Sequence, residues 1–462
     1  MSTVATAKTQ ALWLDQVGPI EPRDPLGGDR TVDVAIVGGG YSGLWTAYYL
    51  AMLDPSLDIA VIEKHHCGYG ASGRNGGWAV GELAGSFEKY ARLGGAEASM
   101  RLARAAFDAV DEIGRVAEAE GIDCGYAKGG TIRLARNAPQ AERQTAEMEE
   151  VRELGFTEDE VRLLSATGAR EYLNATEVRS GIYFAATAAL HPARLALGLA
   201  DAVERRGVTI WEQTGADAVD GDRVITDRGT VRARSIIRAT EAYTPSLRGM
   251  RRTLLPVYSL MIATEPLDDA VFDEIGLHGR ATFADDRHMV IYGQRTADNR
   301  IAFGGRGVPY LWGSRIARLA ELHEPSHELI RQTLVELLPQ VGGAGITHRW
   351  GGVLGIPRNW VPGLDYDAAA GHGFLGGYVG EGVAAANLAG RTMAELVAGV
   401  ETERTGLPWV GARARRWEPE PFRWLGVRAS RRILAAADDR EYRTDREAGA
   451  SFRLSRLLRG GN

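Results

Sequence analysis

Residues 32–63 read VDVAIVGGGYSGLWTAYYLAMLDPSLDIAVIE, and this stretch decides the fold. A short apolar run ends in glycines, an Ala- and Leu-rich stretch with a helical pattern follows, and a second apolar run ends in Glu63. Gly38, Gly40 and Gly43 have the G-x-G-x-x-G spacing, and the acid lies twenty residues beyond the last of them. This order of strand, glycine turn, helix, strand and acid predicts a Rossmann βαβ unit that binds a dinucleotide.

Each position of this motif has a physical role. Gly38 permits the tight turn, Gly40 lacks a Cβ and lets the backbone approach a pyrophosphate, and Gly43 lets the helix pack closely on the strand. The helix is expected to begin near Ser42, so its free N–H groups and the positive end of its dipole point at the phosphates. The second strand returns to the same sheet edge, where Glu63 can accept both ribose hydroxyls.

Length and composition narrow the class of protein. A chain of 462 residues predicts two domains, and 45% hydrophobic with 25% charged residues is globular. The net charge of −6 argues against a nucleic-acid or anionic-membrane partner. The two cysteines form no metal or redox motif, and no signal pattern or apolar run of about 18 residues is present. We therefore expect a cytoplasmic protein without a metal site or a membrane span.

Two further glycine-rich segments follow the same logic. Residues 65–83 read HHCGYGASGRNGGWAVGEL and leave the second strand beside the expected nucleotide. Residues 372–399 repeat the order of strand, glycine turn and helix, with the helix expected to begin near Val383. A second helix N-terminus suits a flavin, because its positive end stabilises the negative charge of the reduced ring. A nicotinamide enzyme does not need this second element, although a purely structural turn would have the same sequence pattern.

With these motifs, the chain resembles the flavin-dependent amine and amino-acid oxidase family, which includes glycine oxidase and sarcosine oxidase. The resemblance is closest to the γ-glutamylputrescine oxidoreductase branch. The matching segments follow the family order along the chain: GGGYSG (38–43), GASGRNGG (70–77), KGGTIRLA (128–135), LHPARLALGLADA (190–202), RATEAYTPSL (238–247), DNRIAFGG (298–305), RWGG (349–352) and GGYVGEGVAAANLAGRTMAEL (376–396).

The resemblance implies an α/β fold with a discontinuous Rossmann-type FAD-binding domain and an α+β second lobe built on an antiparallel sheet. The FAD-binding domain is expected to comprise residues 1–90, 190–247 and 347–400. The substrate domain is expected to comprise residues 91–189 and 248–346. Residues 401–462 are expected to form a C-terminal helical extension.

The resemblance also implies which residues bind FAD. The first glycine motif would hold the diphosphate, Glu63 the adenosine ribose, and the two later glycine segments the flavin. Non-covalent FAD is expected, because Arg74 stands where some relatives attach the flavin to a histidine and neither cysteine lies in the C-terminal half. The full expected set is Gly38, Gly40, Tyr41, Ser42, Gly43, Glu63, Lys64, Gly70, Ala71, Ser72, Arg74, Asn75, Gly76, Gly77, Thr240, Gly380, Glu381, Gly382 and Val383.

The implied reaction is oxidation of a C–N bond. A neutral amine passes a hydride from its α-carbon to flavin N5, and water hydrolyses the imine, so the protein mainly supplies positioning and a dry pocket. Four residues are candidates for the reaction site. Tyr258 and Trp350 could line the pocket or fill the core, His288 could tune amine protonation or lie at the surface, and Arg306 could pair with a substrate carboxylate or a structural acid.

Two departures from the family pattern keep alternatives open. No lysine follows Lys128, whereas sarcosine-oxidase-like members use one to assist oxygen, so the electron acceptor is oxygen or another compound. Val353 and Leu354 stand where glycine-oxidase-like members carry a carboxylate-binding arginine, which favours a small amine or N-substituted amino acid over an α-amino acid. The alternatives are a C–O dehydrogenase with His288 or His372 as base, or a flavin-binding electron-transfer module without turnover.

Overall fold

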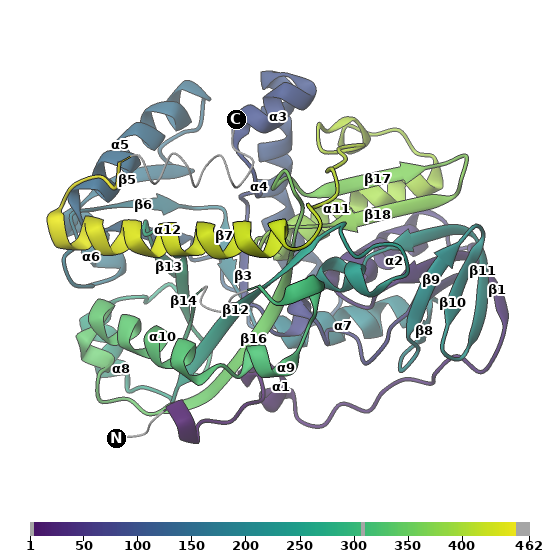
Figure 1. Ribbon diagram of the computed structural model, residues 1–462, viewed down its shortest axis with the longest axis horizontal. Coiled ribbons are helices and arrows are strands. Elements are labelled where there is room, and N and C mark those ends of the chain that lie inside the picture. Colours follow the sequence, from purple (N-terminus) through teal and green to yellow (C-terminus); the bar gives the residue numbers. More distant parts are fainter. Residues whose placement is uncertain (1–3, 306–309, 450–462) are drawn as a thin grey trace.

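Two large sheets organise the computed structural model, which describes residues 4–305 and 310–449 (Figure 1). The first sheet contains β1 (Arg30–Val37), β2 (Ile59–Ile62), β8 (Thr209–Trp211), β9 (Ala216–Asp220), β10 (Arg223–Thr226), β11 (Gly229–Arg238), β17 (Gly363–Asp367) and β18 (His372–Gly376). Its central order is β17-β18-β11-β1-β2-β8, and β18, β11, β1, β2 and β8 are parallel. Parallel strands place their carboxyl ends at one edge, where α/β sheets bind ligands.

The second sheet is mostly antiparallel. It contains β4 (Thr131–Ala135), β5 (Val161–Ser165), β6 (Ser180–Phe184), β12 (Leu255–Thr264), β13 (Thr282–Asp285), β14 (Ile291–Arg295), β15 (Ile301–Gly305) and β16 (Ile346–Ile356). Its order is β16-β12-β15-β14-β13-β4-β6-β5, with only the β13–β4 pair parallel among the described strands. A short pair, β3 (Trp78–Val80) and β7 (Thr187–Ala189), follows the glycine loop. The two sheets match the predicted α/β fold with an antiparallel second lobe.

Helices cover both sheets. The longer helices are α2 (Tyr41–Leu53), α3 (Phe87–Gly94), α4 (Ala96–Ala119), α5 (Ala138–Glu153), α7 (Pro192–Glu204), α10 (Glu324–Leu337), α11 (Gly382–Ala398) and α12 (Phe422–Thr444). The shorter helices are α1 (Leu12–Val17), α6 (Ala166–Tyr172), α8 (Asp269–Ile275) and α9 (Arg318–Glu321). Nearly every side chain of α2 is buried, because α4, α7 and α11 pack around it. A Cβ on Gly390 of α11 would come within 2.9 Å of the Thr46 backbone, so this glycine lets α2 and α11 approach closely.

Two elements bear on the domain boundaries expected from the sequence. β16 falls in the segment 347–400 expected to bind FAD, but it pairs with β12 along the edge of the second sheet. α4 falls in the segment 91–189 expected in the substrate domain, and it shares a core cluster with α2 and α11. The boundaries themselves stay a proposal.

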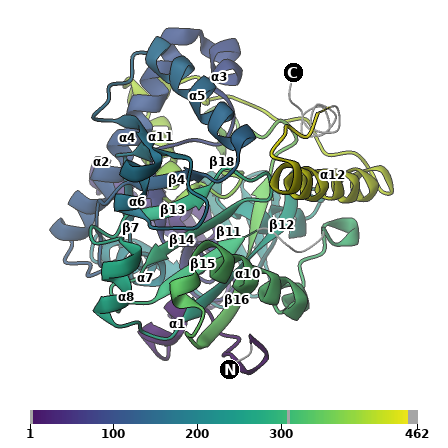
Figure 2. The same ribbon diagram turned by 90° about the vertical axis from the view of Figure 1, so that its left-hand side faces the viewer.

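The C-terminal extension contains α12, which Figure 1 shows in yellow across the lobe of the second sheet. Figure 2 shows the same helix at the outer side of the molecule, away from α2 and α4. Within residues 4–305 and 310–449, no helix combines the length and apolar character that crossing a membrane requires.

Candidate cofactor and substrate site

A cavity of about 730 Å³ lies at the carboxyl ends of the parallel strands. Of the expected cofactor-binding residues, fourteen line it: Gly38, Gly40, Tyr41, Ser42, Glu63, Lys64, Gly70, Ala71, Ser72, Asn75, Thr240, Gly380, Gly382 and Val383. Arg74, Gly76 and Glu381 line a second cavity described below, and Gly43 and Gly77 line neither. The three glycine segments therefore meet around one long space.

The turn after β1 requires its glycines. Gly38 has φ +115°, and a Cβ there would lie 2.6 Å from the Ala239 carbonyl oxygen. A Cβ on Gly43 would overlap the Gly38 carbonyl oxygen, so this position fixes the close packing of α2 on β1. The N-terminus of α2 thereby faces the cavity, so the positive end of its dipole is directed at a phosphate bound there. These features fit the diphosphate of a dinucleotide.

Glu63 ends the second strand and lines the same cavity. Its Oε2 accepts the Gly39 N–H at 2.8 Å and its Oε1 accepts the His65 N–H at 2.9 Å. Burial raises the pKa of Glu63, and the two backbone donors partly offset this effect. The carboxylate is thus held in place at the edge where the ribose of a dinucleotide would lie.

The glycine loop after β2 is fixed by contacts to distant parts of the chain. Ser72 Oγ accepts the Tyr41 N–H at 2.9 Å, and Arg74 pairs with Glu321 at 2.9 Å. Trp350 on β16 donates its Nε1–H to the Arg74 carbonyl at 2.9 Å. A Cβ on Gly76 would lie 2.7 Å from the Tyr292 ring, so this side of the loop is in close contact with β14. The loop backbone is therefore held between the two lobes.

The C-terminal glycine turn contacts the first glycine motif directly. The Tyr378 hydroxyl is 2.8 Å from Ser42 Oγ, although the two residues are 336 positions apart in the sequence. Tyr378 also donates its backbone N–H to Glu241 at 3.1 Å. The second oxygen of Glu241 is buried without a hydrogen-bond partner, and burial raises the pKa of this carboxyl to about 7. The helix α11 begins at Gly382, beside the cavity.

A second cavity, of about 350 Å³, adjoins the first. Ala71, Asn75, Leu354, Gly380 and Val383 line both, so the two spaces meet between the glycine turns and β16. The walls of the second cavity also include Trp78 and Tyr292, whose rings meet edge to face at 6.0 Å. A small substrate in this space would lie directly beside a group bound in the larger cavity.

The charges of the second cavity are unevenly compensated. Its three arginines are paired: Arg74 with Glu321, Arg133 with Glu147 and Asp286, and Arg287 with Asp285. Glu82 also lines it, and no ion pair or hydrogen bond satisfies this carboxylate among the described residues. The Glu82 side chain is exposed to the open cavity. The protein atoms around it nevertheless raise its pKa by partial desolvation, and the nearby charge of Arg133 partly offsets the effect. Glu82 therefore has no direct partner in the described part of this cavity, whereas its arginines do.

The four sequence-derived reaction-site candidates lie in different places. Trp350 is buried and holds the glycine loop, as described above. Tyr258 is buried in the core of the second lobe, accepts the Ala317 N–H at 2.7 Å, and lines a separate cavity beside α12. His288 lies beside α12, with its Nε2 3.1 Å from Glu441. Arg306 falls outside the described residues.

Sequence reasoning did not identify Glu82, Glu241 or the contacts of α12. Glu82 comes five residues after Gly77, and its charged side chain so close to a flavin-type loop was the available signal. Glu241 lies next to Thr240, but nothing in the pattern shows that its carboxylate is buried. His372, the alternative base, bonds the Gly221 carbonyl at 2.7 Å on the first sheet and lines neither cavity.

Comparison with known proteins gives consistent results. The model of the FAD dependent oxidoreductase (DAO) family matches residues 33–396. A probable oxidoreductase, OrdL, of Haemophilus influenzae is 30% identical over 385 residues, covering 81% of this chain and 85% of its own. The γ-glutamylputrescine oxidoreductase of Escherichia coli is 29% identical over 407 residues, covering 85% and 90%. The glycine oxidase from Geobacillus kaustophilus superposes with a TM-score of 0.67 at 22% identity over 81% and 96% of the chains, which shows a shared fold.

Proposed function

Because the chain belongs to the family of FAD-dependent oxidoreductases, we propose that it oxidises the C–N bond of a small amine whose far end carries a second positive charge. FAD is the cofactor, as the resemblance implied, and the protein is an oxidoreductase enzyme. When bound, FAD supplies the acceptor for the hydride that leaves the carbon beside nitrogen, and water hydrolyses the resulting imine.

The observation that carries this proposal is the charge of the second cavity. Among the described residues, Glu82 has no ion pair or hydrogen bond, whereas each arginine lining that cavity already pairs with a carboxylate. A substrate carboxylate would find no free arginine partner in this part of the structure. An ammonium group would find the Glu82 carboxylate, which stabilises it by a charge-assisted hydrogen bond.

The chain's own residues have positioning roles in this proposal. Glu82 would fix the far end of the substrate, so that the reacting carbon lies near the turn at Gly380. Trp78 and Tyr292 would exclude water from the space between them. Trp350 would act through the Arg74 carbonyl, by holding the glycine loop at the position that the cofactor needs.

The test is anaerobic reduction of the FAD-loaded protein by candidate substrates. The measurement is the loss of the oxidised-flavin absorbance. An α,ω-diamine should bleach the flavin faster than a monoamine of equal length, and hydroxy acids and glycerol phosphate should leave it oxidised. Bleaching by hydroxy acids alone would overturn the proposal in favour of C–O oxidation. A flavin that responds to dithionite but to none of these substrates would point to an electron-transfer module.

A further inference from the structure

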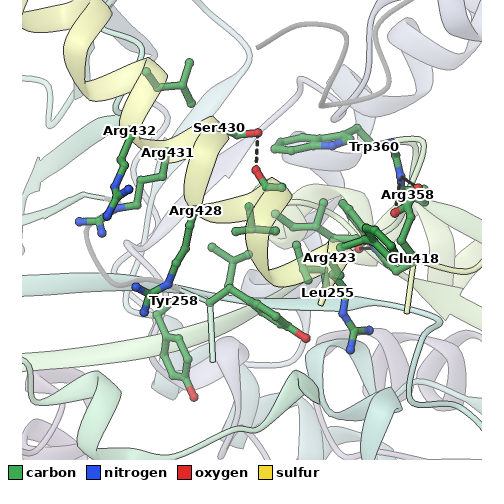
Figure 3. Close-up of a pocket in the computed structure, with 18 of the residues that line it drawn as sticks. Leu255, Tyr258, Arg358, Trp360, Glu418, Arg423, Arg428, Ser430, Arg431 and Arg432 are labelled. Carbon is green, nitrogen blue, oxygen red and sulfur yellow. Dashed lines mark hydrogen bonds and ion pairs between the residues drawn. The ribbon is translucent and has the colours of Figure 1, made fainter. Parts of the chain in front are cut away.

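A separate cavity of about 410 Å³ lies between α12 and the ends of β12 and β16 (Figure 3). Its walls are largely apolar and include Leu255 and Val257 from β12, Ile356 from β16, and the rings of Trp360 and Trp417. Trp417 is fixed there because its Nε1–H donates to the Ile356 carbonyl at 2.7 Å. The cavity is therefore a preformed apolar space rather than a gap between mobile side chains.

The helix α12 gives this cavity a basic side. Residues 411–437 contain seven arginines and two glutamates, which gives a net charge of +5 in this segment. Both glutamates are already paired, Glu418 with Arg358 at 3.0 Å and Glu420 with Arg423 at 2.9 Å. Three arginines of α12, Arg428, Arg431 and Arg432, line the cavity on this side.

Arg428 is the key residue of this basic side. Figure 3 shows it reaching from α12 toward the strand that carries Tyr258, with Trp360 on the opposite wall. Its guanidinium lies 4.2 Å from the centroid of the Trp424 ring, and its Nε is buried without a hydrogen-bond partner. No carboxylate lies within ion-pairing distance of Arg428 in the described part of the chain. A half-buried, unpaired guanidinium costs free energy that an anion in the cavity would recover.

We propose that this cavity binds an amphipathic organic anion, a small molecule with a carboxylate or phosphate head and an apolar body. The head would pair with Arg428, and the body would pack against Leu255, Ile356 and Trp360. Burial and the charge of Arg428 lower the pKa of the neighbouring Arg431 guanidinium, which is consistent with a basic wall on this side of the cavity. The α12 wall lies beyond residue 396, where the family match ends, so the basic side of this site belongs to the extension.

Isothermal titration calorimetry of the FAD-loaded protein with octanoate tests the proposal, with 1-octanol as the uncharged probe of the same length. Octanoate should bind at least about tenfold more tightly than octanol, and Arg428→Gln should remove most of this difference. Arg440→Gln is the matched control, because Arg440 is exposed on the same helix and does not line the cavity. Trp360→Ala, on the opposite wall, should weaken both probes.

Several outcomes would overturn the proposal. The proposal would be wrong if octanoate did not bind, if octanol bound equally tightly, or if Arg428→Gln bound octanoate as tightly as the unchanged protein. An equal loss of octanoate affinity in Arg428→Gln and Arg440→Gln would indicate a general charge effect and would also contradict it. Octanoate that acts as a competitive inhibitor of amine turnover would place it in the substrate cavity instead. The calorimetric readout does not depend on turnover, so failure here is distinguishable from failure of the proposed amine oxidation.

Discussion

Glu82 differs from the other charged residues around the second cavity, because its carboxylate has no partner among the described residues. We expect Glu82→Gln to raise the KM for an α,ω-diamine by roughly tenfold, the loss expected for one charge-assisted hydrogen bond. The KM for a monoamine of equal length should change little, since that substrate has no second ammonium. Steady-state kinetics with both amines measures the difference.

Glu88→Gln serves as the control for this variant. Glu88 is exposed on α3 and lies outside both cavities, so the same change of charge there should leave both KM values unaltered. If Glu82→Gln raised the KM of the two amines equally, Glu82 would not recognise a second charge, and the proposed substrate class would be wrong.

Glu241 makes the stability of the FAD-free protein depend on pH. Its folded-state pKa of about 7 is above the reference value of 4.5, so the folded protein binds this proton more tightly than the unfolded chain does. Stability should therefore fall as pH rises from 4.5 through 7, by up to about 3 kcal/mol from this group alone. Glu241→Gln should lack this part of the decline. Urea unfolding of both FAD-free proteins between pH 5 and 8 measures it, and parallel curves for the two proteins would contradict the prediction.

At the scale of elements, α12 holds a loop that borders the second cavity. Asp438 accepts the backbone N–H groups of His288 and Met289 at 2.7 and 2.8 Å, and these residues lie between β13 and β14. Glu441 adds an ion pair with Arg143 at 3.1 Å. Burial alone would raise the pKa of Glu441, but hydrogen bonds from His288 and Arg143 outweigh it and lower the pKa to about 2. The helix thus fixes the 285–290 loop, whose Asp286 and Val290 line the cavity.

Asp438→Ala should accordingly loosen this loop. Two backbone donors would lose their acceptor, so we expect a loss of about 1–3 kcal/mol in the free energy of unfolding and a higher KM for the amine. Asp439→Ala is the matched control, since Asp439 pairs with Arg443 on the exposed side of the same helix and such pairs contribute little. Urea unfolding and steady-state kinetics test both variants. Equal effects of the two changes would show that α12 does not position the loop.

The same elements show which parts of the structure the sequence could predict. The unit β1–α2–β2 was predictable, because its glycines, helix and acid lie within 32 consecutive residues and each position answers a local requirement. The contacts of His288 with Asp438 and of Trp350 with Arg74 were not, because they join residues 150 and 276 positions apart. The sequence pattern of β16 could not show which of the two sheets this strand joins. Strand pairing depends on how the two lobes pack rather than on the strand's own sequence.

At the scale of the whole molecule, the larger cavity joins the two ends of the family-matched region. Gly38 and Glu63 line it from the start of that region, and Gly380 and Val383 line it from the end. The hydrogen bond between Ser42 and Tyr378 is an intramolecular contact that joins the same two ends directly. A ligand that touches all these segments must stabilise the packing of the molecule as one unit, because it binds only where they are assembled.

FAD and FMN should therefore differ strongly as stabilisers. FAD at about one hundred times its Kd should raise the free energy of unfolding by about 2.7 kcal/mol. FMN shares the flavin and one phosphate but lacks the adenosine, so it cannot use the Glu63 end, and the same concentration should give a much smaller shift of the urea midpoint. Glu63→Gln should reduce the advantage of FAD over FMN without changing the response to FMN. Equal stabilisation by the two flavins would mean that contacts of the adenosine half with the β1 and β2 ends add no binding free energy. The assignment of the first glycine motif to the diphosphate and ribose would then be wrong.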